Sequence, residues 1–272
     1  MLDFLYNTTI GRCILRVLTK PVISKLCGTF MDSRISTLLI SSFVRANSID
    51  MSEYIANDFH SFNEFFVRRI RPGMRVFDQD PSAFDAPCDG LLSVYEINED
   101  TVIPVKQSRY SIKRLLHSKK TAAHFNGGYC LVFRLCVDNY HRYTYIDNGV
   151  KGDNHFIPGK LHTVQPIALE KLPVFTENSR EYTVIKTENF GPIVQMEVGA
   201  MLVGRIKNHH RRHVCFRGEE KGYFNYGGST IILLVQKDRI VLDDRILRAT
   251  AQGVETPVKM GEMIGRNTGD GP

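Results

Sequence analysis

Apolar side chains recur at helical spacing through the first part of the chain. Across residues 9–44 they fall three or four positions apart, and Pro21 and Gly28 interrupt the pattern. An apolar stripe with this period predicts two or three amphipathic helices, broken at those two residues. A further helical segment is predicted over residues 61–70, because the Pro72-Gly73 pair that follows is a turn signal.

The pattern changes from about residue 84 onward. Short runs rich in β-branched and aromatic residues recur there, each bounded by Gly, Pro, Asn or Asp. They cover residues 91–97, 130–136, 182–186, 193–203 and 230–235. We therefore predict an α+β fold, with a mostly antiparallel β domain and an N-terminal helical cap. In this division residues 1–75 form an amphipathic helical region and residues 76–272 form the β-rich domain.

Composition places the chain among ordinary globular proteins. Of its 272 residues 43% are hydrophobic and 24% are charged, and the mean hydropathy is −0.18. These values exclude a disordered chain, a collagen-like repeat and a disulfide-dense miniprotein. The longest stretch without a charged residue, 222–236, is shorter than the roughly 20 residues of a membrane-spanning helix. We predict no such helix, and the charged residues near the N-terminus are not typical of a secretory signal.

The basic excess is concentrated at the N-terminus. The chain has a net charge of +6, and its first 45 residues hold six basic residues against two acids. Basic amphipathic helices can lie on an anionic membrane surface. The same pattern fits a helical subdomain that packs on the core and turns a solvated basic face outward, so the pattern leaves both interpretations open.

Cysteine and histidine usage gives two smaller expectations. Six cysteines are scattered without a Cys-X-X-Cys pair, and without a signal peptide we predict free thiols. A basic cluster over residues 205–217 contains three histidines and is open to four interpretations: a metal site, a nucleic-acid patch, a contact for lipid phosphates or a solvated turn. Because it has no cysteine or acid at a familiar zinc spacing and no nucleic-acid-binding module accompanies it, we predict neither metal nor nucleic acid.

A Gly-Gly-Ser segment is the first candidate for chemistry. Gly227 and Gly228 precede Ser229 and an apolar strand. Glycines leave the Gly228 carbonyl unshielded, so that the Ser229 hydroxyl can approach it in a geometry suited to an N-to-O acyl shift. Gly-Gly-Ser also makes ordinary hairpins, and this pattern alone does not separate the two.

Three further segments place polar residues beside predicted strands. Asp89 lies in an Asp-Gly turn before the run 91–97, His141 follows the run 130–136, and His162 lies in the segment 159–164. An isolated Asp in such a position is commonly a turn former, and a lone His is commonly a core or surface residue. Whether these three residues have structural or catalytic roles therefore depends on the context of the whole chain.

Six segments taken together resemble the phosphatidylserine decarboxylase family in order and approximate spacing. They are FNEFFVRRIRPGMR (62–75), APCDG (86–90), DNYHRY (138–143), GKLHTVQP (159–166), VGAMLVGRI (198–206) and RGEEKGYFNYGGSTIILL (217–234). The resemblance is close from about residue 62 to residue 237 and looser over the helical N-terminus. The Gly-Gly-Ser-Thr run is similar to that of the second type of the family.

The resemblance implies a self-processing proenzyme. In the family an Asp and a His activate the serine of a Gly-Ser pair, which attacks the preceding carbonyl; elimination and hydrolysis then leave a pyruvoyl group. The matching positions are Asp89 for the acid, Gly228 and Ser229 for the cleaved bond, and Ser229 for the pyruvoyl cofactor. A serine hydroxyl needs an oriented base because it attacks poorly at neutral pH. Thr230 and backbone N–H groups are candidates to stabilise the oxyanion.

The general base is where the sequence departs from the family. Many members read Tyr-His-Arg-X-His, and the second histidine is usually assigned to self-cleavage, whereas the matching stretch here ends in Thr144. Thr144 cannot act as that base. We expect His141 to take both roles, with His162 as the weaker candidate and impaired processing as the remaining alternative.

The resemblance also implies the second reaction. The pyruvoyl carbonyl condenses with the amine of phosphatidylserine and takes up the electrons released with CO2, and His141 would return a proton to the same carbon. The product would be phosphatidylethanolamine and the enzyme a carboxy-lyase. We expect a peripheral membrane protein on the cytoplasmic face that takes its substrate from an anionic membrane surface, and we leave open whether it forms a homo-oligomer.

Two other functions stay open at this point. One is a processing-deficient homologue that only binds anionic phospholipid, an alternative that Thr144 sustains. The other is a pyruvoyl decarboxylase for a soluble amino acid, against which the matching motifs and the basic N-terminus count. From Ser229 onward six basic residues balance six acids, so the whole basic excess lies on the predicted large chain. That distribution suits a protein that sits on an anionic bilayer.

Overall fold

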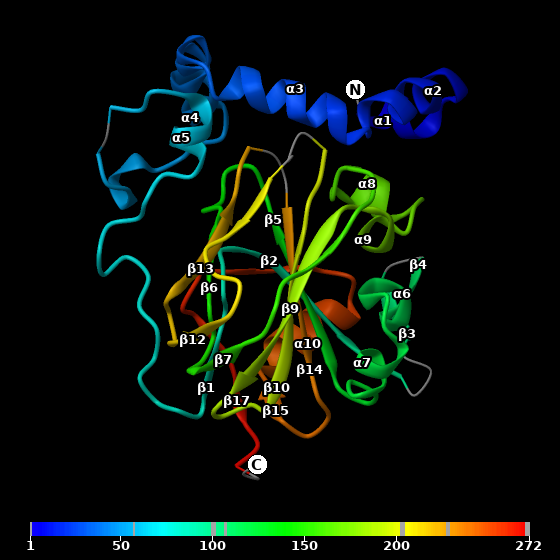
Figure 1. Cartoon of the computed structure of the whole chain (residues 1–272), viewed down its shortest axis with the longest axis vertical. Helices are drawn as coiled ribbons and strands as arrows, with labels where there is room; N and C mark the ends of the chain where they lie inside the picture. Colours follow the sequence, from blue (N-terminus) through cyan, green and yellow to red (C-terminus); the bar gives the residue numbers. More distant parts are fainter. Residues whose placement is uncertain are drawn as a thin grey trace.

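The computed structural model describes residues 2–56, 58–98, 102–105, 108–201, 205–226 and 229–269. It confirms the predicted α+β fold, because every pair of hydrogen-bonded strands that it describes is antiparallel and the N-terminal segment is helical. Figure 1 shows the N-terminal helices lying across one end of the β body, with the C-terminus at the opposite end.

The predicted helices over residues 9–44 are present, with one difference in where they break. The N-terminal elements are α1 (Leu2–Asn7), α2 (Thr9–Leu18), α3 (Pro21–Met31), the 3-10 helix η1 (Arg34–Leu39), α4 (Ile40–Ala46) and the 3-10 helix η2 (Met51–Glu53). Pro21 starts α3 in the first helical turn, where its missing N–H has no partner to lose. Gly28 lies inside α3 and does not end it, since a single glycine only weakens a helix interior.

The predicted helix over residues 61–70 is shorter than expected. Helix α5 covers Phe62–Phe66, and the Ser61 side chain caps it by accepting a hydrogen bond from the Glu64 backbone N–H. Beyond α5 the chain turns into an extended segment in which Ile70 forms an isolated bridge with Tyr54. This tertiary pairing overrides the helical pattern of the sequence.

A large antiparallel sheet forms the centre of the β body. Its strands run in the order β12-β7-β9-β10-β14-β5-β2-β16, and β8 also pairs with β9. The members are β2 (Gly90–Glu96), β5 (Tyr129–Leu135), β7 (Gly149–Lys151), β8 (His155–Ile157), β9 (Arg180–Thr187), β10 (Pro192–Val198), β12 (His213–Cys215), β14 (Ser229–Val235) and β16 (Thr256–Val258). Five of them correspond to the strand runs read from the sequence, although β10 ends at Val198 and residues 202 and 203 of the predicted run 193–203 lie outside the described residues.

Smaller sheets and short helices surround the central sheet (Figure 1). Three further sheets have the strand orders β1-β17-β15, β11-β13-β6 and β3-β4. Their strands are β1 (Ala83–Asp85), β3 (Val102–Val105), β4 (Ser108–Ser111), β6 (Arg142–Thr144), β11 (Ile206–Asn208), β13 (Glu220–Phe224), β15 (Ile240–Leu242) and β17 (Met263–Asn267). The remaining helices are α6 (Ile112–Leu116), α7 (Lys119–Ala123), α8 (Pro166–Leu169), α9 (Val174–Glu177) and α10 (Asp244–Ala251).

Strand β14 fixes the position of Ser229. All seven of its residues are buried, as expected for a continuous apolar run in the middle of a sheet, and it pairs with β10 on one side and β5 on the other. Ser229 is its first residue and lies opposite Leu135, the last residue of β5. The loop that follows β5 therefore begins beside Ser229.

The N-terminal helices divide their apolar side chains between core and solvent. Leu5, Tyr6 and Leu15 belong to the same buried cluster as the central sheet. Other apolar side chains of this region are exposed: Phe4, Ile10, Ile14, Val17, Val22, Leu26, Phe30, Ile35, Leu38 and Leu39. Among the described residues there is no helix with the length and apolar character needed to cross a bilayer. All six cysteines are free, as predicted.

Candidate functional site

Ser229 and His141 meet in the interior of the protein. Neither residue has any exposed surface, and His141 Nδ1 lies 3.2 Å from Ser229 Oγ. The other ring nitrogen, Nε2, lies 3.0 Å from the Cys136 carbonyl oxygen. Because a carbonyl can only accept, Nε2 carries the proton and Nδ1 presents its lone pair to the Ser229 hydroxyl. This is the arrangement that a general base needs.

The register of the sheet brings these groups together. Cys136 directly follows Leu135, the residue paired with Ser229, so its carbonyl lies at the level of the strand end. His141 directly precedes β6, and its own carbonyl accepts a hydrogen bond from the Phe224 backbone N–H. The ring is thus held between the end of β5 and the segment that leads into β14.

Burial keeps the His141 ring neutral. Its pKa is lowered from 6.5 to about 3, chiefly because burial disfavours the charged form and further because Arg68 adds a positive charge nearby. Phe66 packs on the ring at 4.1 Å between centroids. Arg68 is itself buried, and its guanidinium lies over the rings of Tyr54 and Phe65. The His141 ring is therefore neutral at physiological pH, and its Nδ1 lone pair is free for the Ser229 hydroxyl.

The segment before Ser229 is anchored to helix α5. The Tyr226 backbone N–H donates to Asn63 Oδ1 at 3.1 Å, and the Tyr226 ring packs edge-on against Phe62. Gly227 and Gly228, and with them the carbonyl of the predicted cleavage site, lie outside the described residues. Thr230, the next residue of β14, has a buried hydroxyl that makes no hydrogen bond within the described part of the chain.

Asp89 is held by an arginine rather than by the histidine. Its carboxylate receives two hydrogen bonds from Arg75, at 2.9 and 2.7 Å, and a third from the Met260 backbone N–H at 2.8 Å. Arg75 also pairs with Glu53, and its pKa is raised by these partners against the effect of burial. Over the described residues no hydrogen bond joins Asp89 to His141 or Ser229.

Thr144 lies in contact with the segment that contains Asp89. Its backbone N–H and its hydroxyl both donate to the Pro87 carbonyl, at 3.0 and 3.2 Å. These two hydrogen bonds hold the end of β6 against Pro87, two residues before Asp89. The position at which many family members have a second histidine is thus beside the aspartate segment, and here it holds a side chain with no base.

His162 lies in a different cluster. Its Nδ1 is 3.3 Å from the Tyr6 hydroxyl, and its Nε2 is 3.6 Å from a Glu177 carboxylate oxygen. Burial lowers its pKa. In the part of the chain that the structure describes, no hydrogen bond connects it to Ser229 or Asp89. The structure therefore brings His141 to the serine and does not join His162 to it.

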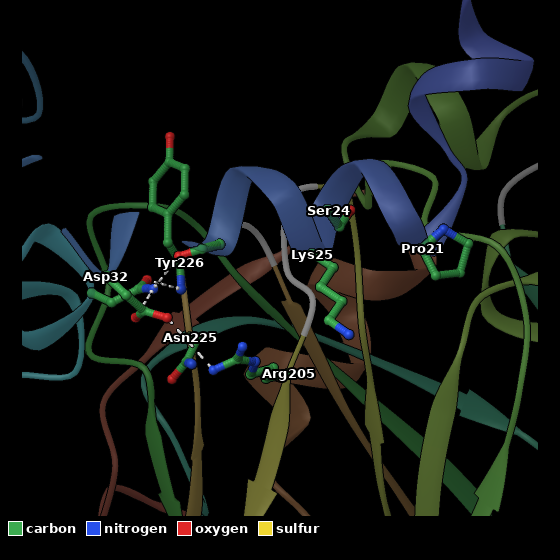
Figure 2. Close-up of a pocket in the computed structure, with 9 residues that line it drawn as sticks. Pro21, Ser24, Lys25, Asp32, Arg205, Asn225 and Tyr226 are labelled. Carbon is green, nitrogen blue, oxygen red and sulfur yellow. Dashed lines mark hydrogen bonds and ion pairs between the residues drawn. The ribbon is translucent and has the colours of Figure 1, made fainter. Parts of the chain in front are cut away.

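A small cavity adjoins the segment that leads to the cleavage site. It has a volume of about 200 Å³, and Lys25 of α3 and Arg205 are among its lining residues together with Asn225 and Tyr226 (Figure 2). Arg205 Nη1 lies 3.5 Å from Asp32 Oδ2, within ion-pair distance. Asp32 also lines the cavity and neutralises Arg205, so Lys25 is the lining cation that has no ion pair among the described residues.

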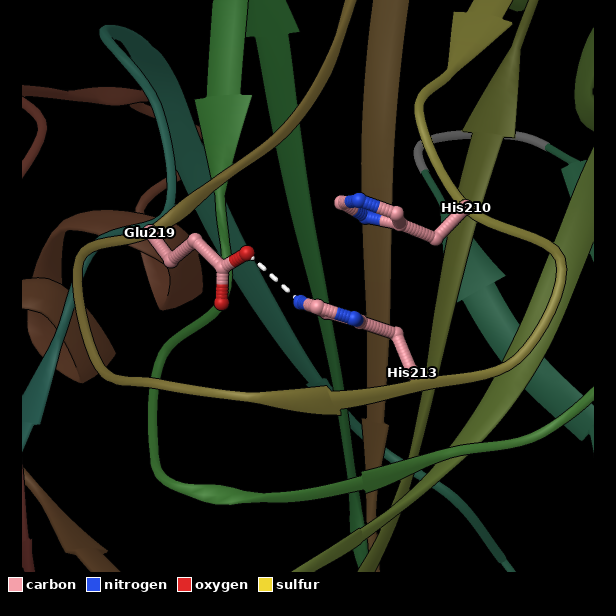
Figure 3. Close-up of side chains that lie close together, drawn as sticks. All are labelled: His210, His213 and Glu219. Atoms are coloured by element: carbon pink, nitrogen blue, oxygen red, sulfur yellow. Dashed lines mark hydrogen bonds and ion pairs between the residues drawn. The ribbon is translucent and has the colours of Figure 1, made fainter.

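The histidine cluster over residues 205–217 folds into a turn with its own partners. His213 Nε2 lies 2.6 Å from Glu219 Oε1, and the His210 ring stacks on His213 at 3.8 Å, as Figure 3 shows. One potential metal-ligand atom from each of these three residues lies within 4.8 Å of the others. The His213–Glu219 contact and the stacked rings stabilise the turns on the two sides of β12.

Sequence reasoning did not find the partners that orient the site. The Cys136 carbonyl lies only five residues before His141, whereas Phe66 reaches the His141 ring and Arg75 reaches Asp89 from other segments of the chain. The stretch containing Phe66 and Arg75 was recognised only as part of a family motif. No spacing rule within the chain indicates which residue pairs with which, because these contacts depend on tertiary packing.

Comparisons with known proteins agree on one family. The model of a family described as phosphatidylserine decarboxylase matches residues 62–266. The chain is similar to phosphatidylserine decarboxylase proenzyme 2 of Clostridium acetobutylicum, at 45% identity over 97% of this chain and 91% of that protein. It is also similar to the phosphatidylserine decarboxylase proenzymes of Clostridium botulinum, at 39% identity over 96% and 90%, and of Clostridium tetani, at 39% over 98% and 91%.

Proposed function

Because the chain belongs to the phosphatidylserine decarboxylase family, a family of carboxy-lyases, we propose that it cleaves itself between Gly228 and Ser229 and then decarboxylates phosphatidylserine to phosphatidylethanolamine. The observation that carries the proposal is the contact of 3.2 Å between His141 Nδ1 and Ser229 Oγ in a fully buried site. The names of the relatives, which are proenzymes, support the self-processing step.

Self-cleavage begins with proton transfer to His141. The neutral ring takes the proton of the Ser229 hydroxyl, whose oxygen attacks the Gly228 carbonyl and replaces the peptide bond by an ester. Loss of the Cα proton of residue 229 then expels the Gly228 carboxylate, and addition of water with release of ammonia leaves a pyruvoyl group at position 229. The Nε2–H bond to the Cys136 carbonyl stabilises the protonated ring while it holds that charge.

The buried pair also fits the second reaction. A pyruvoyl group supplies the carbonyl that condenses with the substrate amine and accepts the electron pair left by CO2. His141 faces the same position. Its Nδ1 can take the proton that the substrate ammonium group gives up on condensation and then return it to the substrate carbon. The ion pair between Asp89 and Arg75 would hold the segment that contacts Thr144 in place, which is a positioning role. The cavity beside Asn225 and Tyr226 contains Lys25, which would contact the anionic headgroup.

Membrane association forms part of the same proposal. The exposed apolar side chains of α2, α3 and η1 lie on the N-terminal helices, beside the basic residues of the same region. Helices with one apolar and one basic face lie in a membrane interface. The substrate would then enter from the bilayer at the end of the β body that Figure 1 shows beneath these helices. Cytoplasmic location is part of this proposal.

Two alternatives from the sequence have less support. A homologue that only binds phospholipid would not need a serine and a neutral histidine buried in contact. A decarboxylase for a soluble amino acid would not need the exposed apolar surface of the N-terminal helices. Both alternatives also lack a counterpart among the relatives described above.

The pH dependence of self-cleavage tests the role of His141. Since burial lowers its pKa to about 3, the ring stays neutral between about pH 8 and about pH 5, and we expect the first-order rate of cleavage to stay constant within about twofold. A base with an ordinary histidine pKa of about 6.5 would lose activity about 30-fold by pH 5. The measurement is a time course of the two chains on a denaturing gel.

The same pKa sets the range in which this test is valid. Because the folded-state pKa lies below the unfolded value, the unfolded chain binds the proton more readily, and this histidine lowers the folding stability progressively as pH falls below about 6.5. Circular dichroism at each pH therefore accompanies the gel. A fall in cleavage with a midpoint near 6.5 in a chain that is still folded would contradict a base whose pKa is lowered by burial, as proposed for His141.

A further inference from the structure

A second, larger cavity lies against helix α2, away from the Ser229–His141 pair. It has a volume of about 750 Å³. Five cationic side chains line it: Arg12, Arg16, Lys20, Lys160 and Lys171. His162 and Tyr6 form part of its wall, and Glu177 is the acidic residue among those that line it. Of its lining residues only Pro21 is shared with the cavity that contains Lys25 and Arg205.

The cations of this cavity are poorly neutralised. Lys160 pairs with Glu177 at 3.2 Å, and Lys171 donates to the Asn7 side-chain oxygen. Arg12, Arg16 and Lys20 have no ion pair or side-chain hydrogen bond among the described residues. Arg12 and Arg16 are also four residues apart on one helix, a spacing at which like charges repel. Such a cluster is stabilised when an anion binds to it.

His162 adds a buried polar atom to the same wall. It is 5% exposed, and its Nε2 makes no hydrogen bond within the described part of the chain. Its nearest polar neighbour on that side is Glu177, at 3.6 Å. A polar atom of this kind is usually partnered when buried. The residue that the sequence offered as a second catalytic histidine thus contributes a buried polar atom without a hydrogen bond, among the described residues, to the wall of this cavity.

Helix α2 presents this cationic face next to an apolar one. Arg12 and Arg16 lie on the cavity face with Thr9 and Cys13, at the spacing of one side of a helix. Ile10, Ile14 and Val17 lie on a neighbouring face and are 43–69% exposed. Gly11 and Leu15 occupy the third, buried face. An occupant of the cavity would therefore have its charged part among the cations and apolar chains beside it.

We propose that this cavity binds the phosphate headgroup of an anionic phospholipid that is not the molecule being decarboxylated. The charge of the lining selects a phosphate, and the adjoining exposed apolar face of α2 selects a lipid rather than a free phosphate ion. The bound lipid holds the N-terminal helices on the bilayer. This proposal is independent of self-cleavage and adds a specific site to the membrane association proposed above.

The test compares two double variants with the same loss of charge. Arg12→Gln with Arg16→Gln removes the two cations of the cavity face. Arg34→Gln with Arg45→Gln removes two exposed cations of the same N-terminal region that do not line the cavity. Binding of the full-length protein to vesicles of phosphatidylcholine, with or without phosphatidylglycerol, is measured by co-sedimentation. Phosphatidylglycerol has no amine and so is not a substrate.

We expect the cavity variant to bind phosphatidylglycerol vesicles at least about tenfold more weakly than the wild type, and the control variant to lose much less. Equal loss in both variants would overturn the proposal in favour of general surface attraction. Undiminished binding by the cavity variant would overturn it as well. Absence of vesicle binding by the wild type would instead contradict membrane association itself, and would leave the self-cleavage unaffected.

Two further readouts separate the lipid from other occupants. Cys13 lines the cavity and is exposed; we expect its modification by a maleimide to slow on phosphatidylglycerol vesicles and not with inorganic phosphate. Equal protection by inorganic phosphate would show a phosphate site and contradict the lipid.

The activity of the cavity variant is the second readout. Its decarboxylation of a short-chain, water-soluble phosphatidylserine should be the same as that of the wild type. A matching loss there would show that the cavity is the substrate site and overturn the proposal of a second lipid.

Discussion

Replacing Ser229 by alanine is expected to leave a single uncut chain of 31.0 kDa without decarboxylase activity. The variant removes the oxygen that attacks the Gly228 carbonyl, and with it the only source of the pyruvoyl group in the proposed reaction. Both losses should be complete, because no other hydroxyl lies beside His141 Nδ1 among the described residues. A denaturing gel and the release of CO2 from phosphatidylserine vesicles measure the two effects.

Ser93→Ala is the matched control for this variant. Ser93 is a buried serine on β2, a strand of the same sheet, and it has no part in the proposed chemistry. It should be cleaved and active like the wild type. Cleavage of the Ser229→Ala chain at the same position would show that another group starts the reaction and would contradict the assignment of Ser229.

Replacing His141 is expected to have the second-largest effect. A positioned general base commonly contributes about 10²–10⁴-fold, so His141→Ala should slow the appearance of the two chains by that range or abolish it. His141→Gln should behave in the same way. The Gln side chain can still donate to the Cys136 carbonyl but has no basic nitrogen for the Ser229 hydroxyl. Agreement between the two variants separates loss of the base from loss of packing against Phe66.

His162→Gln distinguishes the two histidines. It changes a buried histidine that contacts Tyr6 and Glu177 rather than Ser229, so self-cleavage should proceed at the wild-type rate. Thermal unfolding of each variant shows that it is folded. Normal cleavage and decarboxylation in folded His141 variants would remove His141 from the mechanism, and loss of cleavage only in the His162 variant would assign the base to His162.

The sequence predicted the elements of this fold better than their ends. Short runs rich in β-branched and aromatic residues identified β2, β5, β9, β10 and β14, because these strands are largely buried and their side chains must fit a core. The end of α5 at Phe66 was missed, since the bridge between Tyr54 and Ile70 is a tertiary contact. The effect of Gly28 was overestimated, because the surrounding residues keep α3 helical.

The candidate site was predicted in its chemical groups and not in its contacts. Motif resemblance supplied Asp89, His141, His162 and Ser229, but it could not show that the register of β14 with β5 places Ser229 beside the Cys136 loop. It could not show that Arg75 takes both carboxylate oxygens of Asp89. Pairings between segments this far apart follow from three-dimensional packing, which no local pattern encodes.

The mass of the small chain is the most direct test of the proposed self-processing. The purified wild-type protein is incubated and then reduced with borohydride, with or without phosphatidylserine, and each chain is weighed intact. We expect a chain ending at Gly228 and a small chain from residues 229–272 that has lost its amine, gains two hydrogens on reduction, and carries a phospholipid adduct when reduced with the substrate. A single chain of 31.0 kDa after prolonged incubation, or a small chain that begins with an intact serine, would contradict the proposal.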